Sequence, residues 1–142
     1  MTSESRATSD LARLLDRGYG AWNRDDREAW IEVLHPEIEF WTSGLFPGFD
    51  EVYRGHAGMR RFWDAMKDPW EVFELLPDAD RIVTLGDEVM VPLHFHGRGR
   101  ATGIDVQLEM FHVGRLEDGM LRELIAVGEE EAAQALFRDR AG

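Results

Sequence analysis

The second half of the chain is a series of strand-like segments separated by turn residues. These segments are rich in β-branched and aromatic residues and cover residues 70–76, 81–85, 88–98, 104–116 and 120–127. Gly86-Asp87 and Asp118-Gly119 lie between them and supply the positive φ angles that tight hairpins require. Consecutive strands are therefore expected to pair antiparallel in one sheet.

Apolar residues in the first half recur at helical spacing instead. Three stripes have this spacing: Leu11, Leu14, Leu15, Tyr19 and Trp22; Ala29, Trp30, Val33 and Leu34; and Met59, Phe62, Trp63 and Met66. The first helix is expected to begin at Ser9 or Asp10, and the others to end before Pro36 and Pro69. The irregular stretch 44–55 predicts a loop over the mouth of a pocket, and 129–139 predicts a closing helix.

This order of elements predicts an α+β fold with one curved antiparallel sheet. We expect the three N-terminal helices on the concave side, which would leave a cone with an internal cavity. The chain of 142 residues fits a single domain over residues 1–142, with residues 1–8 flexible.

Composition excludes several classes of function. The net charge of −12 repels nucleic acid, and no cluster of Lys and Arg interleaved with aromatic residues offsets it. The absence of Cys excludes disulfides, thiolate metal sites and a Cys nucleophile. No phosphate-binding glycine loop follows a strand, so we expect no cofactor. No apolar run is long enough to span a membrane and the first ten residues are polar, which favours a cytoplasmic protein without a membrane partner.

The cavity predicted inside the cone is expected to be aromatic and to bind a small apolar ligand. The residues predicted to contact that ligand are Trp22, Trp30, Phe40, Trp41, Phe62, Trp63 and Phe111.

Four stretches in this order resemble the SnoaL-like branch of the nuclear transport factor two-like superfamily. They are AWNRDD at 21–26, HPEIEFW at 35–41, YRGHAGMRRFW at 53–63, and FHV at 111–113 leading to EDG at 117–119. The resemblance implies a cone-shaped α+β barrel, a homodimer through the sheet and a pocket for a small apolar molecule. The superfamily includes polyketide cyclases, ketosteroid isomerases, dehydratases and epoxide hydrolases as well as binding modules, so the resemblance does not imply one reaction.

Glu109 is the first candidate for acid–base chemistry. Alternation along 107–113 can place its carboxyl group on the concave face, and the resemblance implies a protonated acid on this strand in the isomerase branch. The alternative is an ion pair with Arg98, Arg100 or Arg122 on a solvated face. The resemblance also implies a catalytic base near Trp41, where this chain has no carboxylate.

His94 and His96 are two residues apart, so both point to the same side of one strand. Inside the pocket they could act as general bases, or bind a metal with Glu109. Outside it they would be surface or dimer residues. We predict no metal, because the strand with the two histidines lacks the partner residues expected of a metal site. Tyr19 is predicted to orient a substrate oxygen.

The remaining three histidines are not predicted to be catalytic. We expect His35 to end the second helix, His56 to cap the third helix or overhang the pocket, and His112 to project from the face opposite the pocket.

Two functions remain open. One is a cofactor-independent isomerase, cyclase, dehydratase or hydrolase that uses Glu109 with His94 or His96. The other is a ligand-binding or dimerisation module without catalysis. For either, we predict a homodimer through the outer sheet face, where Leu108, Met110 and Leu124 are expected to be exposed.

Overall fold

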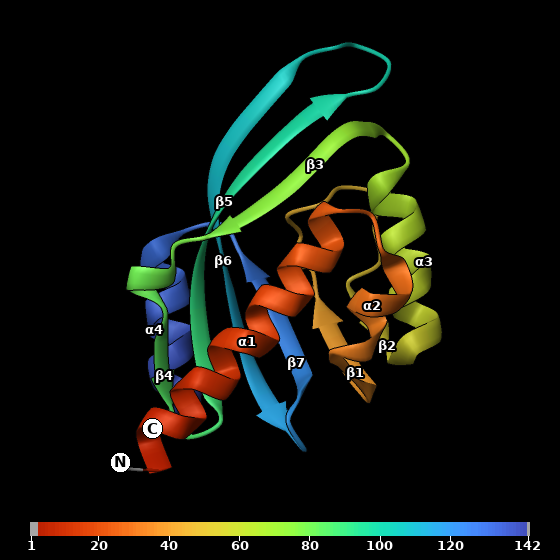
Figure 1. Ribbon diagram of the computed structural model, residues 1–142. Coiled ribbons are helices and arrows are strands. Elements are labelled where there is room, and N and C mark those ends of the chain that lie inside the picture. Colours follow the sequence, from red (N-terminus) through yellow and green to blue (C-terminus); the bar gives the residue numbers. More distant parts are fainter. Residues whose placement is uncertain (1–2, 142) are drawn as a thin grey trace.

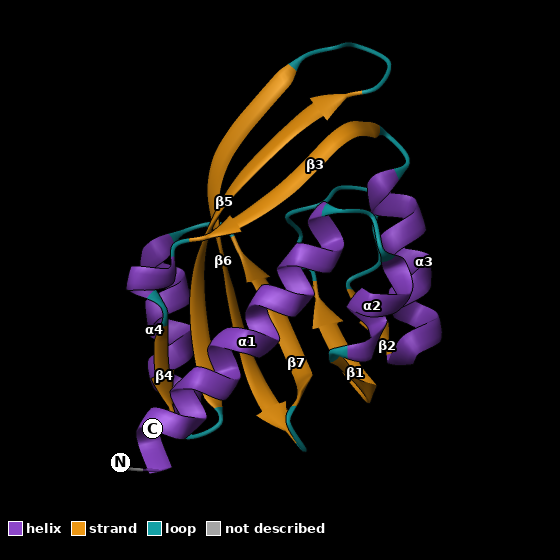
Figure 2. Ribbon diagram, in the orientation of Figure 1, coloured by secondary structure: helices purple, strands orange, loops and turns teal. Residues whose placement is uncertain are grey.

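The computed structural model describes residues 3–141, so residues 1 and 2 of the segment expected to be flexible lie outside it. The first half contains α1 (Ser3–Asn23), α2 (Arg27–Glu32), β1 (Leu34–Trp41), β2 (Val52–Arg54) and α3 (Gly55–Lys67). The second half contains β3 (Trp70–Pro77), the 3-10 helix η1 (Ala79–Arg81), β4 (Val83–Leu85), β5 (Glu88–Gly99), β6 (Asp105–Glu117), β7 (Met120–Val127) and α4 (Glu130–Ala141). The predicted order of helices and strands is confirmed except in the stretch 44–55, which was expected to be a loop and contains β2 (Figures 1 and 2).

The strands form one curved sheet in the order β2-β1-β7-β6-β5-β3, and β4 pairs with the first residues of β5. The sheet is not closed into a barrel. Its β4–β5 and β6–β7 hairpins are antiparallel, as the turn residues predicted, and Gly86, Asp118 and Gly119 have φ angles of 61°, 55° and 75°. The expectation of a wholly antiparallel sheet is wrong, because β1 pairs with β7 in parallel where the two ends of the chain meet.

The first three helices lie on the concave side of the sheet, with α1 crossing it and α2 and α3 beside β1 (Figure 1). Asn23 at the end of α1 binds the backbone of Leu75 through two hydrogen bonds of 2.8 Å, which fastens this helix to β3. Helix α4 covers part of the opposite face, where Phe111, Val113 and Phe137 form a second apolar cluster.

Two element boundaries differ from the sequence expectation. Helix α2 ends at Glu32 and β1 already begins at Leu34, so His35 lies in a strand and does not end a helix. The residue before a proline favours extended backbone, so Pro36 favours a strand conformation at His35 instead of another turn of helix. Helix α1 begins at Ser3 and continues through Ser9 and Asp10, neither of which caps it.

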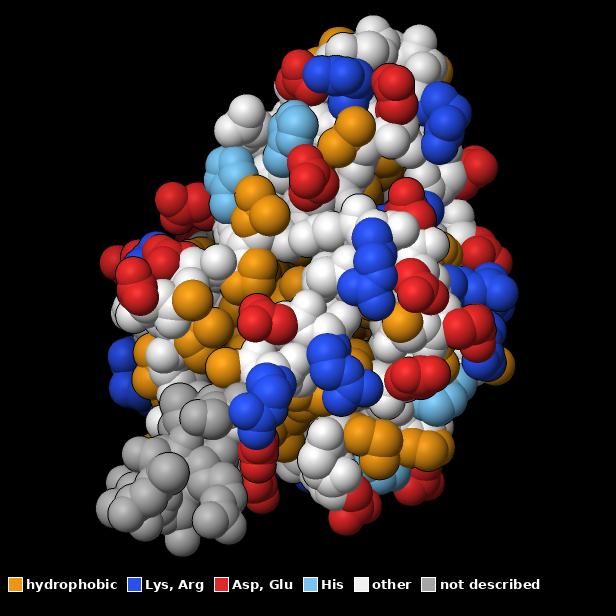
Figure 3. Space-filling model, viewed as in Figure 1, with side chains coloured by type: hydrophobic (Ala, Val, Ile, Leu, Met, Phe, Trp, Pro, Cys, Tyr) orange, Lys and Arg blue, Asp and Glu red, His pale blue; other side chains and the backbone are white. Residues whose placement is uncertain are grey.

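The surface carries both signs of charge. In Figure 3, acidic and basic side chains are spread over the visible face with hydrophobic side chains between them. No helix within residues 3–141 is both long and apolar enough to cross a membrane.

Candidate functional site

An apolar cavity of about 50 Å³ lies between the concave face of the sheet and the first three helices. Tyr19, Trp22, Trp30, Phe40 and Phe62 lie on its wall. The rest of the wall consists of Leu, Val, Phe and Gly residues and one histidine, His112. No carboxylate, lysine or arginine of the described chain lines it.

Tyr19 and His112 form the polar pair of this cavity. The Tyr19 hydroxyl lies 2.7 Å from His112 Nδ1, and the two rings stack with their centroids 5.7 Å apart. Burial lowers the pKa of His112 to about 3, because an apolar surrounding disfavours the imidazolium. Burial also raises the pKa of the Tyr19 hydroxyl, although part of the residue stays accessible. Both groups are therefore uncharged near neutral pH.

Local structure explains how these residues meet. Tyr19 and Trp22 are three residues apart on α1 and so share one face of that helix. Along β6 the side chains alternate, so that Met110 and His112 belong to the concave face and Phe111 to the face covered by α4.

The same alternation places Glu109 outside the cavity. Glu109 lies on the same side of β6 as Phe111, is exposed and does not line the cavity. Of the two placements that the sequence left open, the structure shows the solvated one and excludes the concave face. The alternation of side chains along a strand divides its residues into two sets that point to opposite faces. It does not say which set points into the cavity. The apolar residues Phe111 and Val113, which suggested the inner face, are buried against α4 instead.

His94 and His96 also lie outside the cavity wall. Their ladder partners in β6 are Glu109 and Gln107, on the same outer side of the sheet. His94 Nε2 lies 3.1 Å from Gln107 Oε1. His96 Nδ1 lies 3.2 Å from Glu74, and its Nε2 lies 3.4 Å from Asp105. The structure therefore does not bring these histidines together with Tyr19.

Three of the predicted ligand-binding residues do not line the cavity. Trp41 lies beneath the Arg54 guanidinium, 5.9 Å from the ring centroid. Trp63 packs edge-on against Trp22 at 4.8 Å and supports the wall from behind. Phe111 belongs to the cluster under α4.

Leu108 is the one residue of the expected outer patch that is exposed. Met110 and Leu124 are buried in the main core, and Leu124 lines the cavity, so their expected exposure is wrong.

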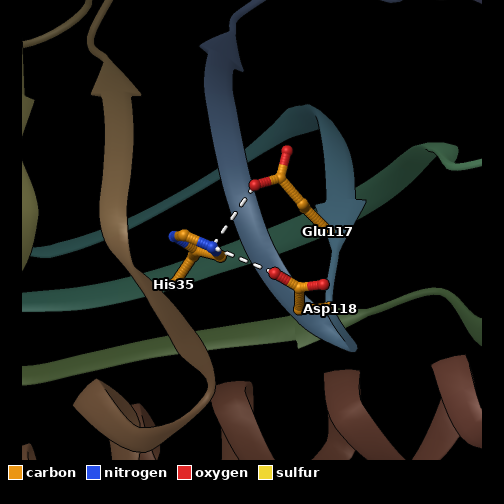
Figure 4. A group of neighbouring side chains, drawn as sticks. All are labelled: His35, Glu117 and Asp118. Atoms are coloured by element: carbon orange, nitrogen blue, oxygen red, sulfur yellow. Dashed lines mark ion pairs between the residues drawn. The ribbon is translucent and has the colours of Figure 1, made fainter.

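The one group of three metal-ligand side chains within the described residues is His35, Glu117 and Asp118 (Figure 4). His35 Nε2 lies 3.3 Å from Glu117 and 3.6 Å from Asp118, and its Nδ1 accepts the Glu37 N–H at 3.0 Å. A neutral imidazole that accepts at Nδ1 carries its hydrogen on Nε2, so it donates to the carboxylates and has no lone pair there for a metal. These contacts tie β1 to the β6–β7 turn.

His56 also joins two elements of the fold. Its Nε2 lies 2.8 Å from the Leu34 carbonyl oxygen, so it joins α3 to the start of β1 and does not overhang the cavity.

The order of the helices and the curved sheet define a protein of the nuclear transport factor two-like class. The sequence model of the SnoaL-like domain matches residues 15–124, and the chain belongs to the SnoaL-like domain family. This confirms the resemblance seen in the sequence. Comparison with curated protein sequences finds no match.

Solved structures share the fold at low sequence identity. TerC, crystallised with polyporic acid, is 19% identical over 91% of this chain and 98% of its own, with a TM-score of 0.75. A proposed polyketide cyclase from Xanthomonas campestris is 20% identical over 92% and 96%, with a TM-score of 0.69. A Catenulispora acidiphila protein with a ketosteroid isomerase-like fold, in complex with trimethylamine, is 10% identical over 88% and 92%, with a TM-score of 0.71. At these identities the likeness concerns the fold alone.

His112 is the residue that sequence reasoning assigned to the wrong face. The available signal was the alternation of Met110 and His112 with Phe111 and Val113, since either pair could have faced the cavity. Its contact with Tyr19 joins residues 93 positions apart.

Proposed function

We propose that this protein binds a small apolar molecule in its cavity and polarises an oxygen of that molecule through His112. The observation that carries the proposal is the Tyr19–His112 hydrogen bond of 2.7 Å in an otherwise apolar wall. No other residue on this wall has a side chain that commonly transfers protons.

The tautomer of His112 decides what it does. When Tyr19 donates to Nδ1, the hydrogen of the imidazole lies on Nε2. A neutral imidazole with a low pKa is a weak base but remains a hydrogen-bond donor, and it can stabilise the developing charge on a carbonyl oxygen. This chemistry suits isomerisation, cyclisation or dehydration of a substrate whose C–H bond is acidic enough to give its proton to a water molecule.

A ligand needs more room than the cavity offers in this conformation. A cavity of roughly 150 Å³ accommodates benzene, whereas this one measures about 50 Å³. Phe46 lines the cavity from the loop between β1 and β2 and is only half-buried. We therefore expect this loop to move outward when a ligand binds, in agreement with a loop over the pocket mouth.

Binding without catalysis is the second candidate. It is favoured by the absence of any carboxylate among the described cavity residues, since a reaction that removes a tightly held proton needs a stronger base than His112.

One experiment separates the two candidates. Bound 2-tetralone, a ketone with acidic α-hydrogens, is incubated in D₂O and its deuterium uptake is followed by NMR. We expect the wild-type protein to accelerate deuterium uptake relative to buffer. In His112→Phe the uptake should be about 10²-fold slower than in the wild type.

Glu109→Gln serves as the matched control on the same strand, and it should exchange like the wild type because Glu109 is exposed. Equal rates in His112→Phe and the wild type would contradict the proposed role of His112. Binding of 2-tetralone with exchange no faster than in buffer would leave the binding module as the function.

A further inference from the structure

The indole N–H of Trp22 is buried without a hydrogen-bond partner. Trp22 is 2% exposed, and its Nε1 is the one buried side-chain nitrogen or oxygen in the described residues that has no partner. Buried polar groups in folded proteins are nearly always paired, so an unpaired donor calls for an explanation. Trp22 lies on the cavity wall, where a bound molecule could supply the missing acceptor.

Neighbouring side chains restrict the orientation of this indole. The Lys67 ammonium lies 4.4 Å from the Trp22 ring centroid and also donates to Asp25 at 2.7 Å. Trp63 and Phe73 pack against the same indole nearly edge-on, at 4.8 and 5.0 Å. These contacts hold the ring in place, so its N–H cannot simply turn toward solvent.

The charge of the wall limits what can bind there. No charged side chain of the described residues lines the cavity, so an ionised ligand would lose its hydration without gaining a counter-ion. Trp30, Phe40 and Phe62 present aromatic rings on the same wall, and such rings favour contact with a flat apolar skeleton.

We infer that Trp22 is a specificity-determining residue of this cavity and donates its indole hydrogen bond to an oxygen of the ligand. The ligand class is an uncharged, largely aromatic molecule with a carbonyl or hydroxyl oxygen. This inference rests on the proposed binding of a small molecule but not on the polarisation of its oxygen by His112.

The test compares two probes that share one skeleton. 2-Tetralone carries a carbonyl oxygen and tetralin lacks it, and the affinity of each is measured by quenching of tryptophan fluorescence and checked by calorimetry. We expect the wild type to bind 2-tetralone more tightly than tetralin, and Trp22→Phe to lose about tenfold in affinity for 2-tetralone but less than about twofold for tetralin. 2-Naphthoate, an ionised molecule of similar shape, should bind at least about tenfold more weakly than 2-tetralone.

Trp30→Phe is the matched control, because it removes another indole from the same wall. It should change the affinities for 2-tetralone and tetralin by the same factor. Retained tetralin binding shows that Trp22→Phe still folds around the cavity. Failure of the wild type to prefer 2-tetralone over tetralin overturns the inference, as does an equal loss for both probes in Trp22→Phe or strong binding of 2-naphthoate.

The two proposals fail separately. Loss of the carbonyl preference in Trp22→Phe together with background deuterium exchange refutes catalysis through His112 and supports the role of Trp22. Deuterium exchange that depends on His112, without a carbonyl preference that depends on Trp22, supports the role of His112 and refutes that of Trp22.

Discussion

Replacing His112 with glutamine should make the stability of this fold less sensitive to acid. Burial lowers the pKa of His112 from its ordinary value of 6.5 to about 3, so the folded protein excludes a proton that the unfolded chain accepts. Because the unfolded state binds more protons, stability falls as the pH is lowered. This contribution is intact above pH 6.5 and is lost progressively between pH 6.5 and about 3.

The size of the effect follows from the two pKa values. One pKa unit corresponds to about 1.4 kcal/mol, and the unfolded imidazole is almost fully protonated at pH 5 whereas the folded one is not. The free energy of unfolding should therefore drop by about 2 kcal/mol between pH 7 and pH 5 through this residue alone. With a urea dependence of about 2 kcal/mol per M, this moves the unfolding midpoint by about 1 M.

The assay is urea unfolding at pH 7 and pH 5 at one protein concentration, for the wild type, His112→Gln and His94→Gln. Gln keeps a hydrogen-bond acceptor for Tyr19 but does not titrate in this range. His94→Gln is the control, because His94 lies on the outer side of the sheet. We expect the wild type and His94→Gln to lose about 2 kcal/mol more than His112→Gln over this interval. Parallel losses in all three proteins would refute the argument that burial of His112 excludes a proton.

Three further predictions concern the loop, the sheet and assembly. Phe46→Ala should speed association of 2-tetralone about tenfold in stopped-flow fluorescence, because Phe46 lines the cavity from the mouth loop; an unchanged rate would show that access lies elsewhere. Gly114→Ala should destabilise the protein by about 2 kcal/mol in urea unfolding, because a Cβ would lie 2.5 Å from the Glu123 carbonyl oxygen; a neutral effect would contradict this close approach. Sedimentation at micromolar concentration should show a homodimer through the outer sheet face, where Leu76 is 46% exposed; a monomer would contradict it.

The cavity residues that were predicted correctly come mainly from helices. Tyr19, Trp22, Trp30 and Phe62 lie on helical stripes, and all four are on the cavity wall. An amphipathic helix has one apolar face, which must point to the core, so its sequence identifies the inner residues directly.

Strand β6 was less informative because the residues on both of its faces are buried over 110–113. In β6, Met110 and His112 alternate with Phe111 and Val113, and all four are buried. Period-two alternation cannot say which pair is inside when another element covers the second face. This is why Glu109 was a candidate for the cavity and His112 was expected outside it.

The sequence by itself determined the order of the elements, the hairpin turns at Gly86 and Asp118, and the aromatic character of the cavity. These properties depend on local backbone preferences and on helical periodicity, which act over a few residues. Only the tertiary structure decided that α4 covers the outer side of β6 and that His112 therefore faces Tyr19 from 93 positions away. The physical reason is that the face of a strand is chosen by what packs on each side of the sheet, and that choice is made only when distant segments come together.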